Sequence, residues 1–392
     1  MGDAKEVSLS EIIELIGGGT PKTSIPEYWD GDIPWLSVVD FNNGKKYVFD
    51  SEKKITPQGL KNSSTKILNR GDIIISARGT VGVIAVLGKQ MAFNQSCYGV
   101  RSIKGLSTND YIYYLLKDTV SNFLLIAHGG VFDTITRDTF NEIDVILPPL
   151  PEQKTIASVL SSLDDKIDLL HRQNKTLEAM AETLFRQWFD NYETKKHTLF
   201  QLKNLVKHIK PGTNYQPKRI ESGIPFLNIR NLSNGFIDKS DIKYISDDEY
   251  SRVHKAWKPE ENDILISRIG TLGIVALIRR QDLPIAVHYN MLNIKADKTS
   301  HQFLYFLLKS KYFQSEYDTV KRVSVQEYVA VEDAETIEIA LPSSQERMQY
   351  LDEQSISLFA KTLNNYNQIR TLEKLRDTLL PKLMSGEVRV KT

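Results

Sequence analysis

Two long stretches of the chain place apolar residues at alternating intervals of four and three positions. The first runs from Ile156 to Trp188, with Asn174 as the only polar residue at a seam position, and neither Gly nor Pro interrupts it. This spacing is typical of a helix that packs along another helix, and a single seam Asn commonly sets its register. At 1.5 Å per residue the seam would be about 48 Å long.

The second stretch runs from Met348 to Leu383 and keeps the spacing, but four of its seam positions are polar. A second apolar stripe that includes Ile356 and Phe359 runs beside the seam, so we expect this helix to touch more than one neighbour. The alternative is that each helix is amphipathic and packs only on its own globular domain. The predicted coiled-coil seam comprises Leu160, Leu163, Ile167, Leu170, Asn174, Leu177, Leu358, Ile369, Leu372 and Leu379.

The segments before the two helices repeat each other. Residues 72–86 return as residues 263–277, with eight of fifteen positions identical at an offset of 191. The same offset carries Ile33–Leu36 onto Ile224–Leu227. Residues 72–76 and 82–87 are short apolar runs around a Gly-containing turn, which predicts a strand, a turn and a strand in each copy.

The chain therefore consists of two copies of one repeat, each a mixed domain followed by a long helix. We predict an α+β protein with globular domains at 1–150 and 196–343, and helices at 151–195 and 344–392. If the helices pair as an antiparallel coiled coil, a pseudo-two-fold axis relates the copies. Duplex DNA has the same kind of dyad, which favours a target in two parts.

Composition limits the class of protein. Of 392 residues, 41% are hydrophobic and 25% charged, as in ordinary globular proteins. The single cysteine, Cys97, excludes an internal disulfide framework and a Cys-cluster zinc site. The chain shows no basic and apolar leader, and its apolar runs are too short to span a bilayer, so we expect a cytoplasmic protein without a membrane partner.

The net charge is only +1, but charges of one sign are clustered. Residues 45–70 contain seven basic and two acidic side chains, and residues 195–219 contain seven basic and no acidic ones. Residues 327–338 carry five acids and no base. Such segregation suits a local footprint for an anionic partner, although lysine-rich solvated loops would look alike.

Catalytic signatures are sparse. Gly82 and Gly88-Lys89 resemble a phosphate-binding loop, but the spacing is one residue too long and Gln90 replaces the Ser or Thr that would bind Mg²⁺. His128 stands alone beside glycines, without metal-ligand spacing. We therefore expect no catalytic residues, no metal and no cofactor in this chain.

Polar residues instead follow the predicted strands, and they differ between the copies. Arg can bind guanine through two acceptors, and Asn can bind adenine in the same way. The alternative is ordinary drift of loop residues after duplication. The predicted DNA-binding residues are Thr20, Lys22, Ser37, Lys45, Lys46, Arg78, Asn94, Gln95, Asn228, Arg230, Asn231, Arg268, Tyr289, Asn290, Lys321 and Arg322.

Several segments resemble the specificity subunits of type I restriction–modification systems. Gly18–Ser37 is similar to the start of a recognition domain in that family. Leu147–Lys154 and Leu184–Phe189 resemble the beginning and end of its first conserved helix, and Leu379–Val388 resembles the end of the second. Ser343–Glu346 departs from the usual Pro-Leu-Glu-Gln at the start of the second helix, which leaves that start open by a few residues.

The resemblance implies a non-catalytic subunit in a prokaryotic cytoplasm. Each recognition domain would read one half of a bipartite double-stranded DNA target, and the helices would set the spacer and dock methyltransferase subunits, usually two. Those subunits would hold S-adenosylmethionine, and a motor–nuclease subunit would use ATP and Mg²⁺. The exposed apolar stripes also favour self-association without partners.

Two other functions remain open from the residues alone. The chain could be the recognition part of a single-chain methyltransferase or nuclease, which methyl transfer by the isolated chain would establish. It could also be a coiled-coil adaptor that binds only protein. Such an adaptor would show no steep fall of DNA affinity with salt.

Overall fold

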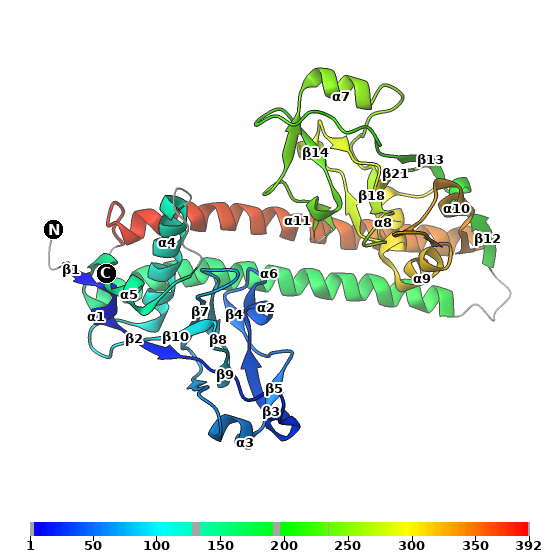
Figure 1. The fold of residues 1–392 in the computed structure, drawn as a ribbon. Coiled ribbons are helices and arrows are strands. Elements are labelled where there is room, and N and C mark those ends of the chain that lie inside the picture. The colour runs from blue at the N-terminus through cyan, green and yellow to red at the C-terminus, as the bar shows by residue number, and fades with distance from the viewer. Residues whose placement is uncertain (1–3, 128–133, 191–196, 234, 391–392) are drawn as a thin grey trace. The chain divides into compact units, whose positions relative to one another are not determined.

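The computed structural model describes residues 4–127, 134–190, 197–233 and 235–390. The chain divides into two compact units, which we describe separately. Unit 1 comprises residues 1–171 and 366–392, and unit 2 comprises residues 172–365. Each unit therefore contains one mixed domain and a segment of each long helix (Figure 1).

Both predicted long helices are present. Helix α6 spans Leu150–Asp190 and helix α11 spans Gln345–Met384. Helix α6 begins one residue before the predicted start and includes Pro151, which is tolerated in a first turn because the amide there has no intrahelical partner. The open start of the second helix is thereby placed at Gln345.

In unit 1 the two helix segments run antiparallel. Ile167 and Leu170 of α6 pack with Ile369 and Leu372 of α11 in one buried cluster. Earlier in α6, Leu160 shares a cluster with residues 380–384 of α11. The earlier part of α6 therefore contacts the later part of α11, as in an antiparallel pair. The predicted seam residues of this unit thus lie at or beside the helix contact, except Leu163, which is half-buried outside both clusters.

In unit 2 the predicted seam Asn meets an Asn on the other helix. Asn365 Nδ2 donates to Asn174 Oδ1 at 3.0 Å, and Gln173 Oε1 lies 3.4 Å from the same amide. Asn174 therefore lies in the contact between the helix segments, as the spacing predicted. Leu358 of the same unit is buried, and Leu177 is half-buried.

The mixed domain of unit 1 contains a five-stranded sheet, β2-β10-β7-β8-β4, and a four-stranded one, β5-β3-β9-β6. Strand β1 pairs with β11, the strand that precedes α6 in the chain. The strands are β1 (Lys5–Ser8), β2 (Ile13–Gly17), β3 (Trp29–Leu36), β4 (Tyr47–Val48), β5 (Lys54–Ile55), β6 (Ile67–Leu68), β7 (Ile73–Ser76), β8 (Ile84–Leu87), β9 (Met91–Phe93), β10 (Cys97–Ser102) and β11 (Asp144–Leu147).

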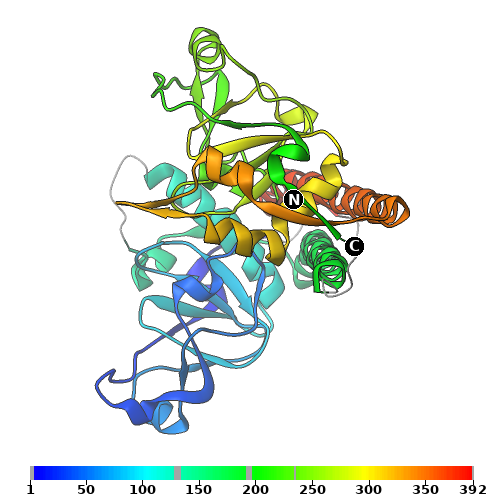
Figure 2. The same ribbon diagram turned by 90° about the vertical axis from the view of Figure 1, so that its right-hand side faces the viewer.

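The helices of this domain are α1 (Leu9–Ile12), α2 (Val38–Phe41), α3 (Pro57–Lys61), α4 (Asn109–Ala127) and α5 (Arg137–Asn141). Helix α4 packs residues 111–116 on β7, β8 and α6 in one buried cluster. In both views β3, β5 and α3 lie at the end of unit 1 away from α6 (Figures 1 and 2).

Unit 2 repeats this plan with a four-stranded sheet, β13-β21-β18-β19, and a three-stranded one, β17-β14-β20. Its strands are β12 (His197–Gln201), β13 (Val206–Pro211), β14 (Ile224–Leu227), β15 (Leu232–Ser233), β16 (Phe236–Ile237), β17 (Lys243–Ile245), β18 (Ile264–Ser267), β19 (Val275–Leu277), β20 (Ala286–Val287), β21 (Met291–Ala296), β22 (Arg322–Val323), β23 (Glu327–Tyr328) and β24 (Glu338–Pro342). Its helices are α7 (Asp247–Val253), α8 (His301–Lys309), α9 (Lys311–Thr319) and α10 (Val331–Thr336).

The predicted strand–turn–strand is present in both units as β7–β8 and β18–β19, each an antiparallel pair. The offset of 191 holds through this hairpin, but it changes afterwards. Ala77 N donates to Ser96 O in unit 1, and Arg268 N donates to Asn290 O in unit 2. Ser96 and Asn290 are therefore equivalent at an offset of 194, because unit 2 has three more residues than unit 1 between the two residues of this bonded pair.

Candidate nucleic-acid interface

Three loops of unit 1 meet at the ends of two parallel strands. Strands β3 and β9 are parallel, so both end at the same edge of their sheet. Asn94, just after β9, donates its backbone N–H to Leu36 O at 2.9 Å, next to Ser37. The turn after β7 joins them, because Ala77 N donates to Ser96 O at 2.8 Å. The structure thus brings together three loops that the sequence singled out.

Unit 2 builds the same edge with other side chains. Strands β14 and β20 are parallel, and His288 N donates to Leu227 O at 3.2 Å. Asn290 Nδ2 donates to Asn228 Oδ1 at 2.9 Å, so two predicted DNA-binding residues contact each other directly. Arg268 joins through its backbone bond to Asn290.

The Gly-containing turn at this edge is held identically in both units. Ser76 Oγ donates to Thr80 O at 2.5 Å and accepts from Val83 N at 2.8 Å. Ser267 Oγ makes the equivalent bonds, to Thr271 O at 2.7 Å and from Ile274 N at 2.8 Å. Each turn has two glycines at positive φ, which other residues adopt only with strain, so the shared residues build the loop.

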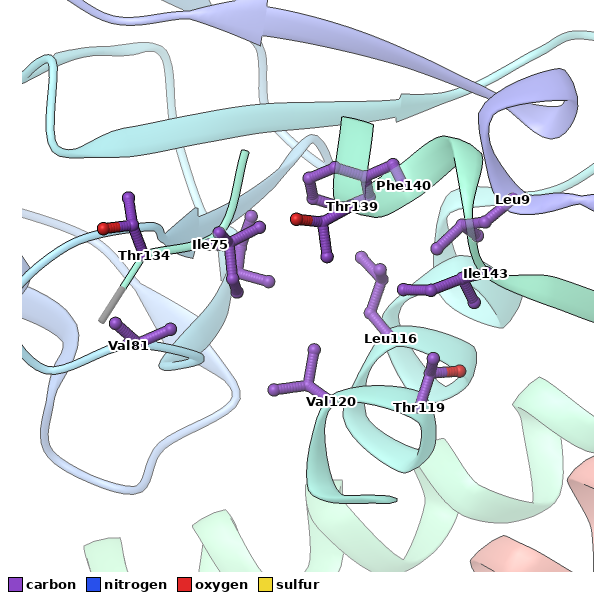
Figure 3. Close-up of a pocket in the computed structure, with 11 residues that line it drawn as sticks. Leu9, Ile75, Val81, Leu116, Thr119, Val120, Thr134, Thr139, Phe140 and Ile143 are labelled. Carbon is purple, nitrogen blue, oxygen red and sulfur yellow. The ribbon is translucent and has the colours of Figure 1, made fainter. Parts of the chain in front are cut away.

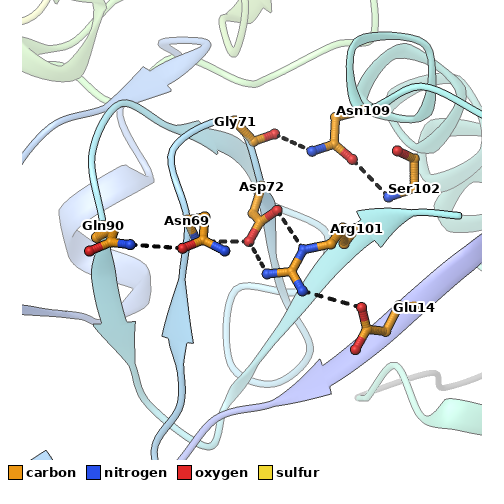
Figure 4. Close-up of polar contacts among 8 residues, drawn as sticks. All are labelled: Glu14, Asn69, Gly71, Asp72, Gln90, Arg101, Ser102 and Asn109. Carbon is orange, nitrogen blue, oxygen red and sulfur yellow. Dashed lines mark hydrogen bonds and ion pairs between the residues drawn. The ribbon is translucent and has the colours of Figure 1, made fainter. Parts of the chain in front are cut away.

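The shared Asp before each hairpin is also structural. Asp72 is buried, accepts from Arg101 Nε at 2.9 Å and Nη2 at 2.6 Å, and accepts from Asn69 N at 2.7 Å (Figure 4). In unit 2, Asp263 accepts from Asn293 Nδ2 at 2.8 Å, and burial raises its pKa. Each of these residues directly precedes the first strand of its hairpin, at the other end of that strand from the turn.

Most predicted residues of unit 1 are accessible at or near this edge. Arg78 and Lys22 are exposed, and Thr20 donates to the exposed Gln95. Lys45 is exposed as well. These positions can contact DNA, and nothing in the structure assigns a base to any of them.

Lys46 does not fit the prediction. Its side chain is 8% exposed and donates to Tyr114 Oη at 3.3 Å and Ser161 Oγ at 2.9 Å. Burial lowers the pKa of Lys46 in spite of nearby carboxylates. This lysine joins the recognition domain to α6 inside unit 1, so it cannot reach a phosphate.

Several predicted residues of unit 2 already have partners. Asn231 is 3% exposed, and its Oδ1 accepts from Asn228 N at 2.9 Å, so it shapes the loop and does not read DNA. Arg268 Nε donates to Val329 O at 2.9 Å. The exposed Arg322 forms an ion pair with Asp333 at 2.6 Å, and Lys321 pairs with Asp318 at 2.9 Å. DNA would have to displace these carboxylates. Tyr289 is half-buried, and its backbone N–H donates to Thr213 O at 2.9 Å.

The structure also places residues at these edges that are not among the predicted DNA-binding residues. His288 Nε2 lies 3.3 Å from Gln216 Nε2, at the edge of unit 2. Arg219 lies over the Phe226 ring at 4.1 Å, and burial together with the nearby Arg230 lowers its pKa. Arg219 is the last residue of the basic cluster at 195–219, and this cluster is the sequence feature that could have pointed to it. Val39 in α2 is 78% exposed, and only its alignment with Arg230 could have drawn attention to it.

Two observations concern nucleophilic and metal-binding side chains in the described parts of the chain. Cys97 is buried, and burial raises the pKa of its thiol to about 12. Across residues 4–127, 134–190, 197–233 and 235–390, no three His, Cys, Asp or Glu side chains gather as metal ligands. An apolar pocket in unit 1 has only threonines as polar lining (Figure 3): it is lined by Leu9, Ile75, Val81, Leu116, Thr119, Val120, Thr134, Ile135, Thr139, Phe140 and Ile143.

Comparison with known proteins identifies relatives along almost the whole chain. Residues 1–179 and 195–377 match the family described as "Type I restriction modification DNA specificity domain". The MjaIX specificity subunit of Methanocaldococcus jannaschii is 31% identical over 99% of this chain and 94% of its own length. The EcoKI specificity subunit of Escherichia coli is 23% identical over 97% of this chain and 88% of its own length.

A solved structure shares the fold. The crystal structure of a type I restriction–modification S subunit from M. genitalium superposes with a TM-score of 0.56 and 16% identity, over 97% of this chain and 96% of that one. In the part of the chain that the structure describes, no helix is both long and apolar enough to cross a membrane.

Proposed function

This chain belongs to the family of type I restriction–modification DNA specificity proteins, and we propose that it is the DNA-recognition subunit of such a system. In this proposal unit 1 reads one half of a split duplex target through the edge formed by β3, β9 and the β7–β8 turn. Unit 2 reads the other half through the edge formed by β14, β20 and the β18–β19 turn. The chain itself catalyses nothing.

One observation supports this proposal above the others. The two edges share their backbone bonds and their loop-building serines, but they present different side chains: Arg78 and Asn94 in unit 1, and Arg268 and His288 in unit 2. Identical scaffolds with different polar residues suit two different base sequences, because base edges are distinguished by donors and acceptors.

The long helices would set the distance between the half-sites and dock the methyltransferase subunits. The spacing fits DNA in scale, since about 48 Å of helix corresponds to roughly 14 base pairs. S-adenosylmethionine would bind the methyltransferase subunits, and ATP with Mg²⁺ would serve a motor–nuclease subunit. The setting would be a prokaryotic cytoplasm.

Selection from a random duplex library tests the proposal. The chain, purified with the methyltransferase subunit of its system, should enrich two short sequences at one fixed separation. Affinity should fall steeply with salt, because phosphate contacts release counterions. A single continuous sequence, or binding indifferent to salt, would contradict the proposal and favour a protein-only adaptor.

A variant in one unit shows which half-site that unit reads. Arg78→Ala should weaken binding by about 1–3 kcal/mol through one half-site only. Ile269→Ala is the matched control, because Ile269 occupies the equivalent turn position in unit 2. Equal losses at both halves for Arg78→Ala would refute this assignment. Methyl transfer by the isolated chain would instead establish the single-chain enzyme.

A further inference from the structure

We propose that positions 39 and 230 are equivalent base-contacting positions, at which Val39 packs against the 5-methyl group of a thymine and Arg230 donates to a guanine. This inference rests on the proposed function, since it assumes that the loop edges face DNA. It names the chemistry of one base contact in each half-site.

Both residues sit on a short helical turn that is built in the same way. In unit 1, Ser37 N donates to Asp40 Oδ2 at 2.7 Å, and Asp40 N donates to Ser37 O at 3.1 Å. In unit 2, Asn228 N donates to Asn231 Oδ1 at 2.9 Å, and Asn231 N donates to Asn228 O at 2.9 Å. This reciprocal cap fixes the backbone, so it also fixes where the second residue of the turn points.

The other residues of each turn serve the scaffold. Val38 packs on the core cluster that contains Leu36, and Phe41 is 1% exposed within the same cluster. Ile229 packs against the corresponding core of unit 2. The cap residues are engaged by their hydrogen bonds. The second residue of the turn takes part in neither the core clusters nor the cap bonds of its unit.

Those two side chains face solvent. Val39 is 78% exposed, and the Arg230 side chain is 54% exposed. A single exposed apolar residue is ordinary on a protein surface. Here it occupies a rigid position, and its counterpart in the other repeat is a cation. The backbone of the turn is the same in both units, but the exposed side chain differs. Two different base contacts would require this combination.

The place of the turn agrees with this role. Each turn directly follows the strand, β3 or β14, whose end defines the loop edge. Asn94 N reaches Leu36 O at 2.9 Å, and His288 N reaches Leu227 O at 3.2 Å, so each turn lies beside the loop after the parallel strand. A ligand at the edge would meet the second residue of the turn.

Base chemistry then decides the partner of each residue. In the major groove, thymine alone offers a methyl group, and a valine can contact it without leaving a polar atom unpaired. Arginine can donate to both guanine O6 and N7. Arg230 is held by the exposed Asp241 at 3.2 Å, a pair that costs little to exchange, and the neighbouring Arg219 adds positive charge.

Substituted duplexes test the Val39 contact. Once selection has given both half-sites, each thymine of the half read by unit 1 is replaced in turn by deoxyuridine, which lacks only the methyl group. For the wild-type complex, one replacement should weaken binding about fourfold, as expected for one methyl lost from an apolar contact. The same replacement should not affect Val39→Ala, which binds more weakly from the start.

Guanines of the other half are replaced by 7-deazaguanine, which lacks the N7 acceptor. One replacement should weaken wild-type binding by roughly tenfold and should not affect Arg230→Ala. Arg70→Ala, in an exposed residue of unit 1, is the control for loss of a positive charge. It should leave the 7-deazaguanine effect unchanged.

The outcomes separate this inference from the proposed function. If the complex selects a split target but Val39→Ala keeps the full sensitivity to every deoxyuridine, or no deoxyuridine matters, the Val39 contact is wrong and the proposed function stands. If Arg230→Ala keeps the full sensitivity to 7-deazaguanine, the Arg230 contact is wrong. If no split target is selected, the proposed function itself fails.

Discussion

The two units join the same kind of recognition domain to their helix segments through different buried chemistry. In unit 1 a buried polar network accompanies the apolar cluster that includes Leu160. Tyr114 Oη donates to Asp164 Oδ2 at 2.6 Å, and Arg376 of α11 donates to Asp164 Oδ1 at 2.8 Å. The Asp164 side chain is 6% exposed and that of Arg376 is 14% exposed, so this is a buried ion pair that also connects α6 to α11.

In unit 2 the corresponding contact is aromatic. The rings of Phe236, Tyr305 and Phe359 lie with their centroids 5.2–6.5 Å apart, and Phe185 of α6 packs on Phe303 at 5.3 Å. Charged groups also border this cluster: Lys309 contacts both Tyr305 and the partly exposed Glu178, and the buried Arg279 lies over the Phe236 ring at 5.2 Å.

The difference shows which property duplication has kept. Backbone geometry is common to both units, but a polar junction and an apolar junction stabilise it in different ways. An ion pair is directional and costs desolvation, so it requires all of its partners. An aromatic cluster gains its free energy from buried area and tolerates modest repacking. Variants at the two junctions should therefore fail differently.

The largest loss is expected from Phe359→Ala. Phe359 is 3% exposed, and its removal leaves a cavity among the rings of unit 2, which should cost about 3–5 kcal/mol of unfolding free energy. Phe359→Leu, which keeps an apolar side chain and leaves a smaller cavity, should cost clearly less. Hydrogen exchange by mass spectrometry would locate the loss. Equal losses from the two variants would show that the cluster does not behave as an apolar core.

Arg376→Met should cost about 3 kcal/mol, because it leaves the Asp164 carboxylate buried without its cation. Breaking a buried ion pair usually costs about 3–5 kcal/mol. We expect a value at the low end of this range because Tyr114 still donates to Asp164. Burial and Asp164 raise the pKa of Tyr114, so its hydroxyl keeps the proton that it donates. Arg370→Met, an exposed residue of the same helix, is the control. Chemical denaturation should show the lower free energy of unfolding. Hydrogen exchange that becomes faster in unit 1 alone would confirm where the loss arises.

The double variant Asp164→Leu with Arg376→Met imitates the apolar junction of unit 2. It should recover most of the stability lost by Arg376→Met, since well-packed apolar residues can replace a buried ion pair at little cost. If the double variant is less stable than the single one, the polar junction contributes net stability of its own.

These elements were not equally predictable from the sequence. The long helices and the β7–β8 and β18–β19 hairpins were, because apolar periodicity records which face is buried. The fate of Lys46 was not: it stands beside the exposed Lys45 in one basic cluster, and only the path of β4 turns its side chain towards Tyr114. Loop residues carry no periodicity, so spatial neighbours such as Asn228 and Asn290 appear only in the fold.

The side chains that accept from the backbone N–H of β9 and of β20 also differ between the units, and the sequence pattern does not predict this difference. The N–H of Phe93 in β9 is satisfied by Thr65 Oγ1 at 3.3 Å, whereas the equivalent N–H of Val287 in β20 is satisfied by His254 Nε2 at 3.2 Å. A hydroxyl and an imidazole perform the same task. Neither residue type nor spacing announces this equivalence, because the two side chains come from different positions around their short helices.

This exchange predicts that acid weakens unit 2 more than unit 1. His254 is 1% exposed, and burial lowers its pKa from 6.5 to about 4, with Lys258 lowering it further and the bond to Trp257 O opposing the shift. The unfolded chain therefore takes up this proton first as the pH falls. Stability is full above about pH 6.5 and should decrease by up to about 3 kcal/mol as the pH approaches 4.

The measurement is hydrogen exchange at pH 7.5 and pH 5 for the wild type and for His254→Gln, which keeps an acceptor without a titratable ring. The wild type should lose protection around β20 between these pH values, and the variant should lose less. Thr65 does not titrate, so protection around β9 in unit 1 provides the internal control. Equal acid sensitivity of β9 and β20 would remove His254 as the cause.

The smallest stability effect is expected from Lys46→Met, which also sharpens the comparison of the junctions. Burial lowers the pKa of Lys46, so the folded state carries the charge at a cost at neutral pH. Methionine removes that cost while Tyr114 keeps its bond to Asp164, and stability should rise by up to about 1 kcal/mol. In the wild type, stability should also rise with pH between the lowered pKa and about 10.5, because the unfolded chain binds the proton longer.

The neighbouring lysine supplies the matched control for function. Lys45 is exposed, so Lys45→Met should weaken DNA binding and reduce the salt slope by about one phosphate contact, without a change in stability. Lys46→Met should leave both DNA affinity and salt slope unchanged. A loss of affinity for Lys46→Met as large as that for Lys45→Met would place Lys46 at the DNA after all. It would also mean that the polar junction of unit 1 opens when DNA binds.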